Sequence, residues 1–361
     1  MLKNTEFNPD WVSPPGDTIS LLVAKDGLNK ACAAKRLHLS QSAYDELIDG
    51  RMQITEQLAH SLAELIGPSQ KFWINRAERY SASLRRAALR LQREIAFPVA
   101  DMKKFGWIPS RSSDESDLAL EVASFMGVRS ISEFEDAFGT LEEALAFRRS
   151  ATFASEIGAV SAWYRAAELR SQELGSIKWS SASFLSSLPE ARSYSLIRDP
   201  ALFVPKLIDL FASCGVALCI LPAPSGCPVS GIAKVSRGRA MISLSSRHLT
   251  DDHFWFSLFH EAAHLILHSD KMSIEIEGGV TEEDEVEANN FAAEYLVPED
   301  RQADLMSLPI NKFSIARFAK SVGVAPGIVV GQLQHKGRLR FNQMNYLKVR
   351  YKWRRAILEM A

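Results

Sequence analysis

Apolar residues recur at three- and four-residue spacing through the first 90 residues, and a turn or capping residue bounds each run. Gly27, Gly50 and Gly67 end three of these runs, since glycine readily adopts the left-handed conformation that stops a helix. Polar residues that accept hydrogen bonds from the first free N–H groups precede the runs. The pattern predicts five short helices, which begin near Asp17, Asn29, Ser40, Thr55 and Ser69.

The middle of the chain, from residue 91 to about 200, has a mainly helical pattern. Phe97-Pro98 and Trp107-Ile108-Pro109 interrupt it, because proline breaks a helix and restricts the residue before it. The serine-rich stretch 176–187 predicts a loop or short capped turns. Residues 91–200 are therefore expected to form a helical connecting region.

Short β-type runs appear after residue 200. A helical pattern at 205–213 precedes an apolar strand at 216–221, and a Pro/Gly turn region follows. Runs at 230–235 and 240–244 flank Arg237-Gly238, which predicts a β-hairpin.

Two strong helical patterns cover 253–268 and 281–296, and Pro298 ends the second. A further pair covers 315–322 and 326–335. The chain is expected to be α+β and mainly α. We expect four parts, namely a five-helix domain at 1–90, the connecting region at 91–200, a small mixed domain with the hairpin at 201–335, and a basic tail at 336–361.

The composition changes this picture mainly by exclusion. The chain has 361 residues, 47% of them hydrophobic and 24% charged, which excludes disordered, collagen-like and low-complexity classes. Its net charge of −1 means that any contact with nucleic acid is local. Four cysteines without redox or zinc-knuckle spacing indicate a reducing compartment. No signal-peptide pattern and no apolar run of about 20 residues is present, so we expect a cytoplasmic protein.

Five of the eight histidines fall between His248 and His268, and among them lies the sequence His260-Glu261-Ala262-Ala263-His264. Positions i and i+4 of a helix share a face, so His260 and His264 can bind one ion. Glu261 then lies where it can polarise a metal-bound water. This HExxH pattern is the short signature of zinc-dependent peptidases.

A third ligand is available on the next predicted helix. Glu285 can complete a His-His-Glu set, and Asn289 can hydrogen-bond the back of a ligand histidine. Glu282 and Glu287 are the alternatives to Glu285 in the same acidic run. His268 continues the histidine face, either in a supporting position behind a ligand or as a ligand itself. The competing interpretation is a buried helix with two structural histidines, followed by a solvated acidic helix.

The segments FWFSLFHEAAHLILH (254–268) and EVEANNFAAEYLVP (285–298) resemble the ImmA/IrrE family of metallopeptidases. The resemblance covers roughly 155–335 and differs mildly at Leu296-Val297-Pro298, where Leu-Met-Pro is commoner. It implies Zn²⁺ bound by His260, His264 and Glu285, with Glu261 as the catalytic base. It also implies a protein substrate, such as a transcriptional regulator, added as a β-strand to the hairpin at 230–244.

Residues 1–90 resemble the HigA-like antitoxins with an XRE-type helix-turn-helix, on NPDWVSPPGDTI, LNKACAAKRLHLSQSAYDELIDGRMQIT and QLAHSLAELIGPSQKFWINRAERY. The resemblance implies binding to double-stranded DNA through a recognition helix that starts at Ser40. Gln41, Ser42 and Tyr44 would then face base edges, and Arg51 and Gln53 would touch phosphate.

Three acids lie on that same helix, Asp45, Glu46 and Asp49, and they would repel phosphate. The alternative is therefore a five-helix module used only for dimerisation or for docking a partner. The basic tail is equally open, since from Lys336 to Arg355 it carries eight Lys/Arg and no acid. It either grips nucleic acid or, as we expect, docks its aromatic residues on the body as an amphipathic helix.

Two functions of different classes follow. The first is a DNA-associated zinc endopeptidase that cleaves a protein partner. We expect this partner to be a transcriptional regulator or antitoxin-like protein, and we expect low activity on unfolded chains in general. The second is an antitoxin-like DNA-binding repressor whose metal fold is a sensor or scaffold, although the presence of Glu261 argues against it. A homodimer is open under both. His335, Tyr295 and Arg317 are candidates for the donor to the oxyanion, and residues 91–200 for the docking surface.

Overall fold

The computed structural model describes residues 13–110, 114–148, 156–173, 177–269, 272–276 and 283–361. The chain divides into two compact units, and each is described by itself. Unit 1 comprises Met1–Ile95 and Arg111–Gly139, and unit 2 comprises Ala96–Ser110 and Thr140–Ala361. The described residues form many helices, one four-stranded sheet and one two-stranded hairpin, so the expected α+β, mainly α class is confirmed.

Unit 1 begins with the five predicted helices, and the starts of four of them confirm the capping signals, whereas Asp17 lies in the first turn of the first helix and does not cap it. The side chains of Asn29, Ser40, Thr55 and Ser69 each accept the backbone N–H three residues further along. The helices are α1 (Pro15–Lys25), α2 (Lys30–Arg36), α3 (Gln41–Ile48), α4 (Glu56–Ile66) and α5 (Gln70–Glu94). Ile19, Leu47, Leu62 and Trp73 meet in their common core.

The middle of the chain is helical, as predicted, with α6 (Val99–Lys104), α7 (Glu115–Met126), α8 (Ile131–Arg148), α9 (Ile157–Glu173) and α10 (Ser181–Ser193). The serine-rich stretch is helical from Ser181 onward rather than a loop or short turns. Ser180 caps α10 by accepting the N–H of Ser183, and Phe184 and Leu188 of this helix are fully buried. Burial of these two side chains stabilises a helix that the serines alone would not predict.

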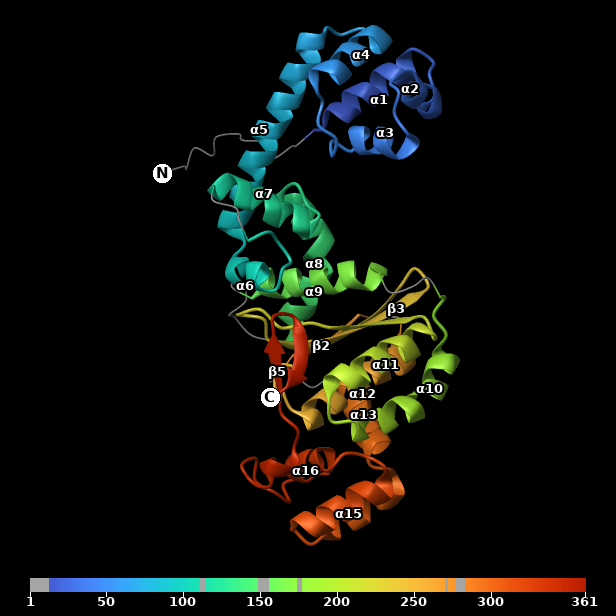
Figure 1. The fold of residues 1–361 in the computed structure, drawn as a ribbon, viewed down its shortest axis with the longest axis vertical. Helices are drawn as coiled ribbons and strands as arrows, with labels where there is room; N and C mark the ends of the chain where they lie inside the picture. The colour runs from blue at the N-terminus through green and yellow to red at the C-terminus, as the bar shows by residue number, and fades with distance from the viewer. Residues whose placement is uncertain (1–12, 111–113, 149–155, 174–176, 270–271, 277–282) are drawn as a thin grey trace. The chain divides into compact units, whose positions relative to one another are not determined.

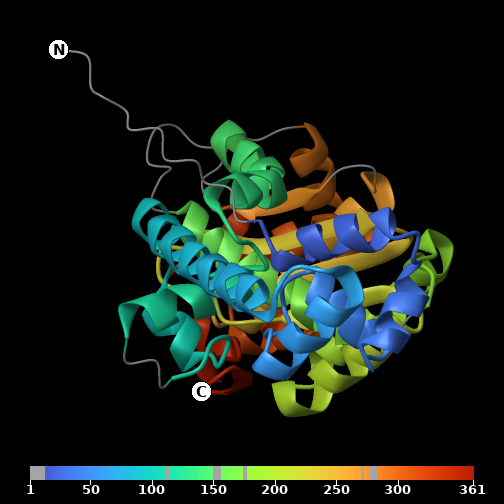
Figure 2. The same cartoon turned by 90° about the horizontal axis from the view of Figure 1, so that it is seen from above.

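The sheet of unit 2 contains β1 (Val216–Ile220), β2 (Val229–Ser236), β3 (Arg239–Leu244) and β4 (Ser273–Ile276), in the order β1-β3-β2-β4. β2 and β3 form the predicted hairpin, and β1 runs parallel to β3. Figure 2 shows these yellow and orange strands side by side. Helix α9 covers one face, and α11 (Pro200–Ala212) and α12 (Asp251–Leu267) cover the other (Figure 1).

The hairpin is not an open edge for a substrate strand. β4 pairs antiparallel with β2 on the side away from β3, placing Ile274 opposite Ile232 and Glu275 opposite Gly231. The expectation that a peptide adds to residues 230–235 is therefore wrong as far as Ala233, because β4 occupies that side of β2 up to this residue. The sheet ends instead at β4 and β1.

The last third of unit 2 is helical and then returns to β-structure. α13 (Glu283–Leu296) stops before Pro298, and α14 (Gln302–Ser307), α15 (Lys312–Val322) and α16 (Pro326–His335) follow. Within the described part of the chain no single helix has the length and apolar character of a membrane span. α15 and α16 meet those criteria only as a pair, which is bent by 105°.

The basic tail does not form the expected amphipathic helix. Its end is a hairpin of β5 (Tyr351–Arg354) and β6 (Ile357–Met360), in which Tyr351 faces Met360. Val349, Tyr351 and Leu358 belong to the core of unit 2, whereas Phe341 and Tyr346 are exposed. Aromatic residues at alternate positions suit a strand whose two faces differ in burial, which explains the difference.

Candidate metal centre

Helix α12 lies in the interior of unit 2 because its sequence is apolar on nearly every side. Phe254, Trp255, Leu258 and Phe259 are buried against the sheet and the neighbouring helices. The polar residues of the HExxH sequence share this environment, with exposed fractions of 1% for His260, 0% for Glu261 and 3% for His264. Burying such groups is costly without partners, so their contacts indicate what this part of the helix does.

Helix α13 supplies the partner carboxylate. Ala288 and Ala292 are fully buried where α13 meets α12, and these small side chains allow the two helices to approach closely. Glu285, one turn before Ala288, is 8% exposed and faces the two histidines. The alternative Glu287 contacts His268 instead, and the alternative Glu282 lies outside the described residues.

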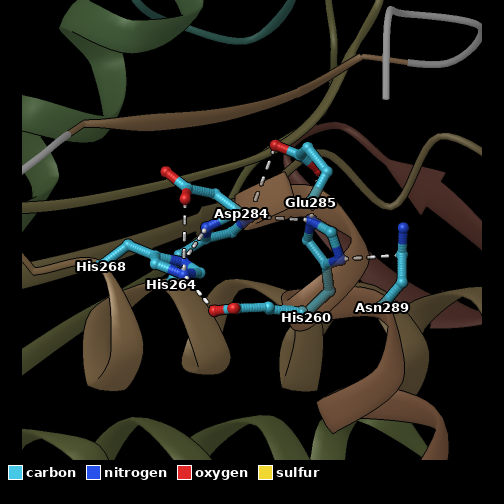
Figure 3. A network of polar contacts seen from close by, with 7 residues as sticks. His260, His264, His268, Asp284, Glu285 and Asn289 are labelled. Carbon is cyan, nitrogen blue, oxygen red and sulfur yellow. Dashed lines mark hydrogen bonds and ion pairs between the residues drawn. The ribbon is translucent and has the colours of Figure 1, made fainter. Parts of the chain in front are cut away.

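His260, His264 and Glu285 converge on one point (Figure 3). The two histidine Nε2 atoms are 3.1 Å apart, and the Glu285 carboxylate oxygens lie 3.2 Å from His260 Nε2 and 3.5 Å from His264 Nε2. Ligand atoms of a tetrahedral zinc site lie about 3.3–3.6 Å from one another, given bond lengths of about 2.0–2.2 Å. The spacing and the His-His-Glu donor set therefore fit a zinc ion with a fourth position open.

Further side chains hold these three in place. Asn289 Oδ1 lies 3.1 Å from His260 Nδ1, the nitrogen that faces away from the cluster. His268 Nδ1 lies 3.2 Å from His264 Nδ1, and His268 Nε2 lies 3.0 Å from Glu287 Oε2 (Figure 3). His268 therefore sits behind a candidate ligand rather than among the three. Contacts of this kind fix the orientation of a metal-binding imidazole.

The two histidines have opposite pKa shifts. Burial alone would lower the pKa of His260, but the hydrogen bond to Glu285 and the nearby carboxylates outweigh it and raise the pKa to about 9. Burial and the neighbouring His260 lower the pKa of His264. The surrounding carboxylates thus favour the protonated form of His260. A bound metal requires both imidazoles to be neutral, so metal binding would release that proton.

Glu261 is held against the backbone of β2. A Cβ atom at Gly231 would overlap the Glu261 carboxylate, so this strand position must be glycine for the carboxylate to keep its place. Sequence reasoning missed both Gly231 and Glu275, which faces Gly231 across the β2–β4 pair. No local signal marks Gly231, because the side chain that needs the space lies thirty positions further along.

The three candidates for the oxyanion donor lie in different places. His335 lines a cavity next to the cluster. Tyr295 stacks on Phe259 and Phe291, with ring centroids 5.1 and 5.4 Å apart. Arg317 is exposed on α15. Of these three, His335 is the one in the wall of that cavity.

In unit 1, four of the five candidate DNA contacts are exposed, namely Gln41, Ser42, Arg51 and Gln53. Arg51 pairs with Asp49 at 2.6 Å, and Asp45 and Glu46 are also exposed. Tyr44 is only 1% exposed and belongs to the core of unit 1. The expectation that Tyr44 faces base edges is therefore wrong. It lies one turn before the buried Leu47, on the inner face of α3.

Comparison with known protein families gives a match in the region of the metal cluster. Residues 227–331 match the model of the IrrE N-terminal-like domain, peptidase family M78. No curated protein matches the chain, and no solved structure matches it. The matched segment runs from the residues before β2 to the middle of α16 and includes the His-His-Glu cluster. Residues 227–331 are thus similar to the IrrE N-terminal-like domain of a metallopeptidase family.

Proposed function

We propose that this protein is a zinc-dependent endopeptidase that cleaves a protein partner, in the class of transcriptional regulators or antitoxin-like proteins. The observation that carries the proposal is the buried cluster of His260, His264 and Glu285 with Glu261 in the same helix turn. A purely structural cluster would need no carboxylate at Glu261, which is completely buried. The match of residues 227–331 to a metallopeptidase family supports the same function.

Each residue has a distinct task in this proposal. Zinc, when bound by His260, His264 and Glu285, would supply the Lewis acidity that activates a water molecule and polarises the scissile carbonyl. Glu261 would accept the proton of that water and return it to the leaving amine. Asn289 would keep the His260 ring in its ligating orientation through their 3.1 Å contact.

Replacement of Glu261 by Gln tests the activity without removing a ligand. We expect Glu261→Gln to bind zinc normally and to lose cleavage by about 10²- to 10⁴-fold, the usual contribution of a general acid–base group. The substrates to mix with the zinc-loaded protein are the helix-turn-helix regulators encoded beside its gene. Glu294→Gln, an exposed position on α13, is the matched control. Cleavage that persists in Glu261→Gln at the wild-type rate contradicts the proposal.

We further propose that unit 1 binds double-stranded DNA through the start of α3. Support comes from the exposure of Gln41 and Ser42 in its first turn and of Lys30, Lys35 and Arg36 on α2. Ser42→Ala should alter the sequence preference, whereas Arg51→Ala should weaken binding to all sequences alike and reduce its salt dependence. Binding to the upstream region of its own gene that is no tighter than to random duplex removes this role.

The second candidate function is a DNA-binding repressor in which the metal site is a scaffold or sensor. The favouring observation is that unit 1 presents polar and basic side chains on α2 and α3 independently of unit 2. The two candidates differ in one experiment. If the metal site is a scaffold or sensor, DNA binding and the level of the partner protein should be the same in wild type and in Glu261→Gln. If the protein is an endopeptidase, the cleavage product of the partner should be absent in the variant.

A further inference from the structure

A cavity of about 460 Å³ lies beside the metal cluster, between α12, α13 and α16. Two of its lining residues connect it to the ligand His260. Asn289 contacts the His260 ring at Nδ1, and Phe256 stacks on the same ring with centroids 6.2 Å apart. The cavity thus begins one helical turn before the first ligand. Its volume is in the range of about 300–1,000 Å³ found for ligand sites.

One part of the cavity wall is apolar. Phe256 of α12, Ala293 and Leu296 of α13, and Ile328 of α16 provide it, and Phe341 lies at its border. Leu296 and Ile328 are almost completely buried, so they present a fixed surface rather than a mobile one. Such a surface binds an apolar side chain by removing it from water, at about 25 cal/mol per Å² of area buried.

Two buried oxygen acceptors in the same wall have no hydrogen-bond partner among the described residues, Gln332 Oε1 and Glu275 Oε2. The orientation of Gln332 is fixed, because its Nε2 donates to the carbonyl of Ala293 at 2.7 Å. Gln332 is 7% exposed, and a buried acceptor without a donor is costly. Both atoms can therefore accept N–H donors from a ligand, and the backbone of an extended peptide supplies such donors.

The charges of the wall disfavour an acidic ligand. Asp252 is already paired with Lys348 at 2.6 Å, and both side chains are buried. Gly331 lies close enough to Asp252 that a Cβ there would meet its Oδ2 at 2.6 Å, so α16 packs directly against this side chain. Burial lowers the pKa of His253 and favours its neutral form. Glu275, whose Oε2 is buried, would repel Asp and Glu side chains, whereas the charge of Lys336, which also lines the cavity, is exposed to solvent and therefore screened.

We infer that this cavity binds the residue next to the scissile bond of an extended peptide, and that it selects an apolar side chain such as Leu, Met or Phe. The side chain would occupy the wall formed by Ala293, Leu296 and Ile328, while a backbone N–H donates to Gln332 Oε1. This inference rests on the proposed peptidase function and names the specificity-determining residues of that site. Ala293 sets the depth available to the side chain, because it is the smallest residue of the apolar wall.

The test uses the full chain carrying Glu261→Gln, so that binding is measured without cleavage. Peptides of the form acetyl-Gly-Gly-Xaa-Gly-Gly-amide, with Leu, Phe, Gly, Glu or Lys in the variable position, are probed by saturation-transfer NMR. We expect signals from the Leu and Phe side chains and none from Glu. Ala293→Phe should abolish the Leu signal by filling the cavity. Glu294→Phe, which adds the same ring at the exposed neighbouring position, should leave it unchanged.

A second variant keeps the inference testable if Ala293→Phe fails to fold. Gln332→Met preserves the size of the side chain and removes the acceptor, and should weaken Leu-peptide binding about 3- to 10-fold, as for one hydrogen bond. Equal binding of Leu, Lys and Glu peptides, or binding unaffected by Ala293→Phe and by Gln332→Met, overturns the inference. If the protein binds apolar peptides selectively but never cleaves a substrate, the inference about the cavity holds and the proposed peptidase function is wrong. If the protein cleaves substrates without an apolar preference, the peptidase function holds and the inference is wrong.

Discussion

The two units of the chain differ in what they bury. Among the described residues of unit 1, the buried polar side chains are those of Ser130, Tyr44 and Tyr80, and the rest of the core is apolar. Among its described residues, unit 2 buries six Asp, Glu and His side chains, namely Asp251, Asp252, His260, Glu261, His264 and Glu285. Buried ionisable groups destabilise a fold unless they are paired, so they persist where chemistry requires them. The buried side chains of unit 1 are therefore explained by folding alone, whereas those of unit 2 are not.

The largest effect is expected when a ligand of the metal cluster in unit 2 is removed. His260→Ala removes one of three ligands, and should lower the zinc content from about one per chain to near zero. The remaining His264 and Glu285 would keep their burial without the ion. Elemental analysis of the purified protein measures the loss. His60→Ala, an exposed histidine of unit 1, is the control and should retain all zinc. Full zinc retention in His260→Ala would show that the ligands lie elsewhere.

The same substitution placed in each unit sharpens the contrast next. Gly231→Ala puts a methyl group where the Glu261 carboxylate lies, and should reduce cleavage about 100-fold while zinc content stays unchanged. Gly139→Ala in α8 meets nothing within 4 Å and should stabilise its helix by about 0.5–1 kcal/mol. Cleavage assays and thermal unfolding follow the two variants. Undiminished cleavage in Gly231→Ala would remove the positioning role of this glycine.

These two glycines also show how far the sequence alone leads. The helices of unit 1 were predictable because their signals are local, with Ser40, Thr55 and Ser69 each capping the helix that follows. The metal cluster was equally visible, because HExxH places two ligands one turn apart on a single helix. Glu285 follows from the next helix, whose small residues imply close packing. Each of these inferences depends on a few neighbouring residues.

The features that the sequence did not reveal depend on distant contacts. β4 has only four residues and lies in an acidic segment. Its stability comes from direct pairing with β2, which lies about forty residues earlier in the chain. Helix α10 forms in a serine-rich stretch because Phe184 and Leu188 enter the core. Tyr44 looked like a contact residue, but the period of α3 turns it inward. Tertiary packing decides all three.

A smaller effect is expected behind the ligands. Asn289→Ala removes the contact that orients the His260 ring, and should weaken zinc affinity about 10- to 100-fold without abolishing it. Competition with a fluorescent zinc chelator measures the affinity. Asn290→Ala, the neighbouring exposed position, should have no effect on it. Equal affinities for the two variants would mean that packing alone holds His260 in place.

The pH dependence of stability should also distinguish the units. Burial and the adjacent Asp252 raise the pKa of Asp251 from 3.8 to about 7. Between about pH 4 and pH 7 the folded protein therefore binds more protons at this site than the unfolded chain does. The contribution of Asp251 to the free energy of unfolding accordingly falls as the pH rises through this window.

Asp251→Asn removes this titration, so the stability of unit 2 should decline less steeply between pH 4 and pH 7 than in the wild type. Hydrogen exchange resolved by residue measures each unit separately. Asp209→Asn, at an exposed position of α11, should keep the wild-type slope. Parallel curves for wild type and Asp251→Asn would show that the buried carboxyl titrates as in the unfolded chain.

The smallest expected effect is one in which the two units should agree. Ser40 Oγ accepts the N–H of Ala43 at 3.1 Å in unit 1, and Asn311 Oδ1 accepts the N–H of Ser314 at 3.0 Å in unit 2. Both are helix caps, and replacing either by Ala should cost about 1 kcal/mol. The two losses should match because capping depends on local backbone geometry and is insensitive to what the core contains. Hydrogen exchange of the amides in α3 and α15 measures each loss. A clearly larger loss for Asn311→Ala would mean that the buried charges of unit 2 amplify local changes, and the contrast between the units would then extend beyond the metal centre to the whole fold of unit 2.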